Sequence, residues 1–185
     1  MKITKKIFWN EALKGGIIIG LAWVVFSVIS MLIPGRAIGI LLNILEFLGI
    51  SALIYVFTKK VSKMADDQEG FPYSRCVAFV VCMMLFAGVI TGMYATINFN
   101  FINNDTITDS INGAIVQLQD MNMSAGIDMD SYSSMMKTMM TSPFLLIPFE
   151  IISCVVKGII PGLITSAMAK KDPNVFARRE DEDDE

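Results

Sequence analysis

The sequence predicts an all-α protein, a four-helix transmembrane bundle with short amphipathic helices in its outer loop. Three observations lead to this prediction: an apolar composition, four long apolar runs, and a one-sided distribution of lysine and arginine. The 185 residues are 54% hydrophobic and 18% charged, with a mean hydropathy of +0.56. Soluble domains contain about 45–50% apolar and about 25% charged residues, so this composition indicates a membrane protein.

Four apolar runs are long enough to cross a bilayer, which takes about 20 residues of helix. They occupy residues 15–35, 37–58, 76–101 and 143–169. The first run is too long for the core of a signal peptide and has no small-x-small cleavage pattern after it, so we expect it to be a span. Pro34 and Gly35 predict a tight turn between the first two spans. We expect residues 1–171 to form a single integral membrane domain and residues 172–185 a disordered acidic cytoplasmic tail.

The polar segment 102–142 between the last two spans carries two helical patterns. Apolar residues recur at helical spacing, first Ile107, Ile111, Ala114, Ile115, Leu118 and Met121, then Tyr132, Met135, Met136, Met139 and Met140. This spacing predicts two amphipathic helices on or near the membrane surface. The methionines also suggest a Cu(I) site, because thioethers suit that ion. Their helical spacing favours an adaptable apolar face instead.

Twelve of the fifteen lysine and arginine residues fall on one predicted side of the membrane. They lie in the first 14 residues, in the 59–75 connector and after residue 169. Because positive residues are retained in the cytoplasm, we expect both termini and this connector to be cytoplasmic. The 102–142 loop then faces outward.

Three spans carry the G-x-x-x-G pattern, which lets helices approach closely in lipid. The pairs are Gly16 and Gly20, Gly88 and Gly92, and Gly158 and Gly162. We favour packing within one chain over a dimer interface. Pro148 and Pro161 are expected to kink the fourth span.

Three ionisable residues, Glu46, Glu150 and Lys157, lie inside predicted spans, where a charge facing lipid costs at least ~2.5–3.5 kcal/mol. At ~1.5 Å per residue, Glu46 and Glu150 lie about 14 and 10 Å below the outer ends of their spans. Lys157 points toward their level, because helical side chains lean toward the helix N-terminus. We therefore expect an intramembrane polar cluster of Glu46, Glu150 and Lys157, with Asn43 adding hydrogen bonds.

Three interpretations of this cluster stay open. It is an ion pair that fixes the register of the helices, or a proton or ion relay or small-substrate site. In the third, the span boundaries differ, with Glu150 near the interface or Lys157 snorkelling to it.

The sequence carries no catalytic constellation. It contains no histidine, and its three cysteines, Cys76, Cys82 and Cys154, have no metal or redox spacing. It has no phosphate-binding glycine loop and no G-x-S-x-G motif. We expect no catalytic residues, no cofactor and no metal, and therefore no enzyme. The lipid bilayer is the expected partner, nucleic acid is not, and a membrane-protein partner or a homo-oligomer is left open.

Several segments carry a family resemblance. They are Lys14-Gly15-Gly16, the connector KKVSKMADDQEGFPYSRCVAF, the stretch NFNFINND, and the closing AKKD. This layout resembles the family called domain of unknown function 4199, bacterial membrane proteins found mostly in Bacteroidota. The resemblance implies a small inner-membrane protein of four helices, and it supplies no activity, ligand or functional residues.

Two functional classes follow. The leading interpretation is a non-enzymatic scaffold or accessory subunit that acts through its outer loop or its charged tail. The alternative is a small transporter or ion-coupled component that uses the Glu46, Glu150 and Lys157 cluster. A water-accessible cavity at these residues would favour transport, and a dry, tightly packed bundle would favour the scaffold.

Overall fold

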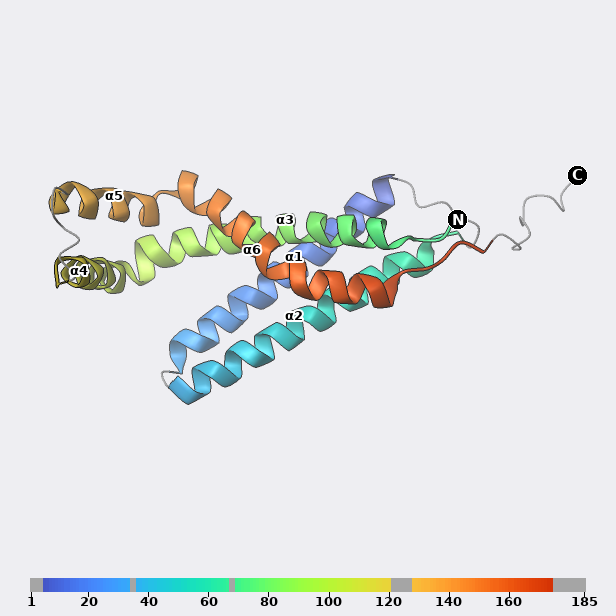
Figure 1. The fold of residues 1–185 in the computed structure, drawn as a ribbon, viewed down its shortest axis with the longest axis horizontal. Coiled ribbons are helices and arrows are strands. Elements are labelled where there is room, and N and C mark those ends of the chain that lie inside the picture. Colours follow the sequence, from blue (N-terminus) through green and yellow to red (C-terminus); the bar gives the residue numbers. More distant parts are fainter. Residues whose placement is uncertain (1–4, 34–35, 67–68, 121–127, 175–185) are drawn as a thin grey trace, which may run out of the picture.

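The computed structural model describes residues 5–33, 36–66, 69–120 and 128–174, and the described chain is helical almost throughout. Its elements are α1 (Lys5–Leu32), α2 (Arg36–Met64), α3 (Tyr73–Ile97), the π-helix η1 (Asn98–Ile102), α4 (Asn104–Asp120), α5 (Met129–Thr141) and α6 (Pro143–Ala169) (Figure 1). No strand occurs in these ranges, which hold only one isolated β-bridge. The predicted all-α class is confirmed. Most of the acidic tail, from residue 175 on, lies outside the described residues.

Within the described chain, four helices are long and apolar enough to cross a membrane: α1, α2, α3 with η1, and α6. The helix α6 has the bounds of the predicted run. The helix α1 begins at Lys5 rather than at residue 15, and α2 continues to Met64 rather than ending at 58. These extensions stay helical because Ala12 and Val61 are fully buried in the core, so packing continues past the apolar runs.

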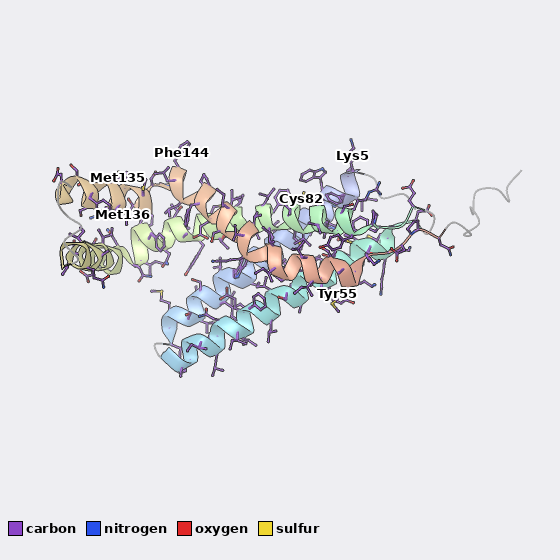
Figure 2. All side chains as sticks on the ribbon, in the orientation of Figure 1. Lys5, Tyr55, Cys82, Met135, Met136 and Phe144 are labelled. Atoms are coloured by element: carbon purple, nitrogen blue, oxygen red, sulfur yellow. The ribbon has the colours of Figure 1, made fainter. Side chains whose placement is uncertain are left out.

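The helices α4 and α5 pack against each other beyond the spans (Figure 1). Ile111 of α4 is 3% exposed, whereas Met135 and Met139 of α5 are exposed. Figure 2 shows this pair at the far end of the molecule from Lys5. The predicted short amphipathic helices are confirmed, and Met121 of the first pattern lies outside the described residues.

The helix α3 is the centre of the bundle, packed mainly against α6 and α1. All six glycines predicted for helix packing lie at these two contacts. A Cβ on Gly88 or Gly92 would stand 2.5 or 2.9 Å from the Cα of Ile151 or Ile147 in α6. The two backbones therefore meet without space for a methyl group, which is how small residues bring helices together in lipid.

The other four glycines follow the same pattern at different neighbours. A Cβ on Gly16 or Gly20 of α1 would press on α3, 2.6 Å from the carbonyl oxygen of Met83 or 3.0 Å from that of Ala87. Gly158 and Gly162 of α6 face flexible or branched side chains of α3 instead, Met84 and Val80 respectively.

The four spans meet closely at one end only. We call the half of the bundle that contains Lys5, Met64, Tyr73 and Ala169 the basic half, and the other half the open half. The buried residues of α1 all lie between Glu11 and Gly20, and the first buried residue of α2 is Ile50. In the open half, the α1–α2 hairpin diverges from α3 and α6 (Figure 1), and the axis of α6, which contains Pro148 and Pro161, changes direction.

A backbone clasp closes the basic half. Phe71, which is 1% exposed, exchanges backbone hydrogen bonds with Lys171 at 2.7 and 3.0 Å. The Lys171 ammonium donates to the carbonyl of Ala65 at 2.7 Å. Gly70 has φ +62°, and a side chain there would meet the Lys171 carbonyl oxygen at 2.6 Å, so glycine suits this turn. The α2–α3 connector is thus bound to the exit of α6.

Candidate functional site

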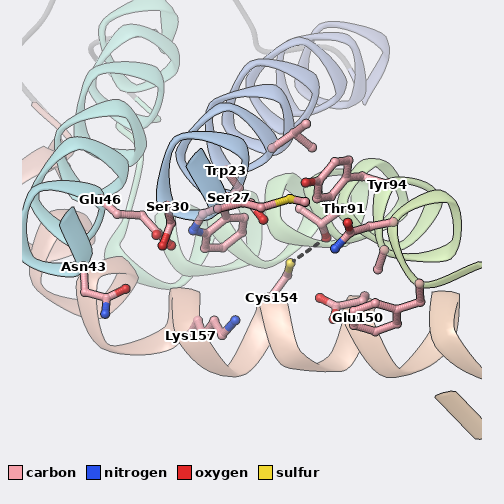
Figure 3. A pocket seen from close by; sticks show the side chains of 15 residues that line it. Trp23, Ser27, Ser30, Asn43, Glu46, Thr91, Tyr94, Glu150, Cys154 and Lys157 are labelled. Atoms are coloured by element: carbon pink, nitrogen blue, oxygen red, sulfur yellow. Dashed lines mark hydrogen bonds between the residues drawn. The ribbon is translucent and has the colours of Figure 1, made fainter. Parts of the chain in front are cut away.

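A cavity of about 510 Å³ lies between the two diverging helix pairs. Its walls come from α1, α2, α3, η1 and α6, so both pairs contribute (Figure 3). The lining residues are Trp23, Val24, Ser27, Ser30, Met31, Asn43, Glu46, Thr91, Tyr94, Ala95, Asn98, Phe99, Glu150, Cys154 and Lys157. Ten of these fifteen side chains carry an oxygen or nitrogen atom.

The α6 wall is a single stripe along the helix. Glu150, Cys154 and Lys157 are spaced at i, i+4 and i+7, so they project from one face. Glu150 and Lys157 are separated by seven residues, about 10 Å along the axis. The stripe therefore offers a carboxylate and an ammonium at two different depths.

The opposite wall comes from the α1–α2 hairpin. Trp23, Ser27 and Ser30 of α1 repeat the i, i+4, i+7 spacing, and Asn43 and Glu46 of α2 lie one turn apart. Figure 3 shows Glu46 directed toward Ser30, across the cavity from α6. The carboxylate therefore enters the cavity from the helix pair that carries no other charged lining residue.

The predicted cluster residues Asn43, Glu46, Glu150 and Lys157 all line this one cavity. The structure does not bring them into contact. No hydrogen bond or ion pair joins any two of these four described residues. Asn43 and Lys157 are exposed, and Glu46 and Glu150 are half-buried, because the helix pairs diverge at this level.

One side-chain bond spans the cavity wall between α3 and α6. The Thr91 hydroxyl and the Cys154 thiol lie 3.2 Å apart, and either group can donate (Figure 3). Thr91 also donates to the carbonyl of Gly88 at 3.2 Å. This contact joins α3 and α6, which together form one wall of the cavity.

The serine stripe of α1 escaped the sequence reasoning, although a signal for it was present. Ser27 and Ser30 lie three residues apart inside an apolar span, and with Trp23 they define one face. Thr91, Tyr94 and Asn98, at i, i+3 and i+7, define one face of α3 and η1 in the same way. Searching each span for polar residues on one face would have found both stripes.

A second polar group that the sequence reasoning missed lies in the basic half. Glu11 of α1 is buried and accepts hydrogen bonds from Lys14 at 2.8 Å and from Lys60 of α2 at 2.7 Å. The two lysine side chains are about half exposed, 53% and 46%. This ion pair joins α1 to α2 at the closed end of the bundle.

The donor set of the cavity suits a small polar molecule. Its volume falls in the range of about 300–1,000 Å³ that is typical of ligand sites. Among the described residues, no three His, Cys, Asp or Glu side chains gather closely enough to hold a metal ion. What the walls offer is hydroxyl, amide, carboxylate and ammonium groups at the level of the spans.

The chain matches, over residues 14–171, the family described as Protein of unknown function (DUF4199). It belongs to that family. The matched region contains all of the cavity-lining residues, from Trp23 to Lys157, and it ends at Lys171 of the backbone clasp. No curated protein and no solved structure matches the chain.

Proposed function

We propose that the protein is a small transporter or ion-coupled component of the bacterial inner membrane, with both termini in the cytoplasm. The observation that carries this proposal is the cavity between the two helix pairs, which Glu46, Glu150 and Lys157 all line. A tightly packed bundle with these groups paired would have supported a purely structural role.

The charges support the same proposal. A carboxylate or ammonium that faces lipid at this depth costs at least ~2.5–3.5 kcal/mol, so chains keep such groups where they serve pairing or a pathway. These three are not paired with one another. Water or a solute in the cavity is then what solvates them.

The orientation rests on the distribution of lysine. Lys14, Lys60 and Lys171 lie in the basic half, where α1 begins and α6 ends (Figure 1). By the positive-inside rule this half faces the cytoplasm. The cavity then opens outward, and the clasp and the Glu11 ion pair close the cytoplasmic side.

A transport cycle requires the cavity to close in the open half and the helices to separate in the basic half. The α1–α2 hairpin would swing toward α3 and α6 and close the cavity around its solute. The same movement would separate the helices in the basic half. Gly16 and Gly20 are the place for such a movement, because α1 and α3 cross there at close range. Helix pairs that rock around a central site are the usual basis of alternating access.

Thiol labelling tests the accessibility of the cavity. In a chain with Cys76, Cys82 and Cys154 replaced by serine, Ser27→Cys places a thiol on the cavity wall, and Val28→Cys places one beside it on a different face of α1. A membrane-impermeant cationic thiol reagent added outside intact cells should modify Ser27→Cys at least about tenfold faster. Equal rates would contradict an outward-facing aqueous cavity.

Flux measurements test the charges. Glu46→Gln and Glu150→Gln should each reduce solute-dependent uptake or ion flux in proteoliposomes, whereas Lys137→Gln, an exposed change on α5, should not. If both carboxylate variants leave flux and every growth phenotype unchanged, the cavity is not a transport site.

A non-enzymatic scaffold or accessory subunit is the second candidate, and the α4–α5 pair favours it. This pair extends beyond the spans and contributes no residue to the cavity wall. Replacing residues 104–141 with a flexible linker should then abolish co-purification of partners in mild detergent and leave labelling of Ser27→Cys unchanged. Unchanged co-purification would remove this candidate.

A further inference from the structure

The cavity presents an unequal set of charges to whatever enters it. Its wall contains two carboxylates, Glu46 and Glu150, and one ammonium, Lys157. The remaining polar lining consists of neutral hydroxyl, amide and indole groups. A ligand that complements this wall carries two positive groups and one negative group.

The arrangement of these charges narrows the ligand further. Glu150 and Lys157 stand on one wall about 10 Å apart along α6. An ammonium and a carboxylate on one carbon atom can lie between them, one facing each. Glu46 stands on the opposite wall, so the second positive group of the ligand has to reach across the cavity (Figure 3).

Two aromatic rings add to the preference for positive charge. Trp23 of α1 and Tyr94 of α3 both line the cavity. The faces of such rings attract ammonium groups, most strongly where water is partly excluded. Ser27 and Ser30 supply hydroxyl oxygen atoms that can accept hydrogen bonds from the same groups.

We propose that the cavity binds a diamino monocarboxylic acid, the class to which free lysine and ornithine belong; this rests on the proposed transport function. The α-ammonium group faces Glu150, the carboxylate faces Lys157, and the distal ammonium faces Glu46. Because Glu46 belongs to the other helix pair, the bound molecule links the two walls and favours their approach.

Binding to the full-length protein in detergent tests this assignment with four matched probes. Free lysine carries all three groups, norleucine lacks the distal amine, 6-aminohexanoate lacks the α-amine, and cadaverine lacks the carboxylate. Free lysine should bind, and each of the other three should bind about tenfold or more weakly, because each leaves one charged wall group without a partner.

Variants assign each group to its wall residue. Glu46→Gln should weaken free lysine to the affinity of norleucine and leave norleucine unchanged. Lys157→Gln should remove the preference for free lysine over cadaverine, and Lys157→Arg should retain it, which separates lost recognition from a misfolded chain. Lys137→Gln should bind like the unaltered protein.

Three outcomes would overturn the assignment: no binding of free lysine or ornithine, equal binding of norleucine, or equal binding of cadaverine. These results are separable from a failure of the transport proposal. If Ser27→Cys is labelled rapidly from outside and free lysine does not bind, the cavity remains a pathway and only the substrate class is wrong. If the labelling rates are also equal, both proposals fail.

Discussion

The basic half and the open half of the bundle are built from the same four helices but differ in packing. In the basic half, Ile54, Val61 and Phe71 are buried, whereas in the open half Leu32, Ile40 and Leu41 face the surroundings. Hydropathy alone does not predict how deeply a helix is buried in the bundle. The most apolar window of α2 is 11% buried and that of α3 is 50% buried, although both helices qualify as membrane spans.

This difference shows what decides packing when the solvent is lipid. Leucine gains little by leaving lipid for another leucine, so apolar content alone does not bring helices together. In the basic half, close contact follows Gly16, Gly20 and the Glu11 ion pair. In the open half, α1 and α2 carry serine, asparagine and glutamate toward the gap instead, and the helices stand apart.

The largest expected effect comes from the clasp of the basic half. Phe71→Ala should lower the free energy of unfolding by about 3–5 kcal/mol, because it removes a fully buried aromatic side chain. The matched change in the open half, Phe101→Ala, alters a side chain that is 82% exposed and should change stability little. Melting temperatures in detergent measure both. Similar losses at the two positions would mean that the halves are equally packed.

A smaller effect is expected where α1 crosses α3. Gly16→Ala places a Cβ 2.5 Å from that of Phe86 and should destabilise the protein by about 1–3 kcal/mol. At Gly39, in the open half of α2, an added Cβ meets nothing within 4 Å. Gly39→Ala should therefore be neutral or stabilise by up to about 1 kcal/mol through helix propensity. If Gly16→Ala is as well tolerated as Gly39→Ala, the two helices do not cross as closely as described.

The smallest effect on stability is expected from replacing Glu11, which forms ion pairs, or Glu46, which lines the cavity. Glu11→Gln should cost about 1 kcal/mol, because it weakens bonds to two lysines that are about half exposed and therefore screened by water. Glu46→Gln should leave the melting temperature unchanged, since Glu46 has no partner among the described residues, and should reduce flux. High salt should shrink the Glu11 effect. A stability loss at Glu46 with none at Glu11 would reverse the comparison.

Much of the fold could be predicted from the sequence, because bilayer thickness imposes a length on every span. The fourth span has its predicted bounds for this reason. The extension of α1 to Lys5 could not be predicted in the same way. Half of residues 5–14 are polar, and this segment stays helical because Ala12 and Glu11 are buried against neighbours that lie far away in the sequence.

The sequence indicated which residues line the candidate site, but it did not indicate how far apart they lie. Depth arithmetic placed Asn43, Glu46, Glu150 and Lys157 at similar levels, and one cavity contains all four. The same arithmetic carries no information on how far apart two helices stand. The divergence of the hairpin from α6 leaves Glu46 and Lys157 unpaired, and the spacing of helices also depends on contacts between residues far apart in the sequence, such as Glu11 and Lys60.

The clasp between Phe71 and Lys171 has a consequence for biosynthesis. Its two backbone segments lie 100 residues apart in the chain, and Lys171 follows α6 directly. The first three spans are therefore synthesised before the clasp can form. The backbone amide and carbonyl of Phe71 have no Lys171 partner until α6 has been made. Formation of the clasp is thereby tied to the synthesis of α6, and a nascent chain that stops short of Lys171 lacks this closure.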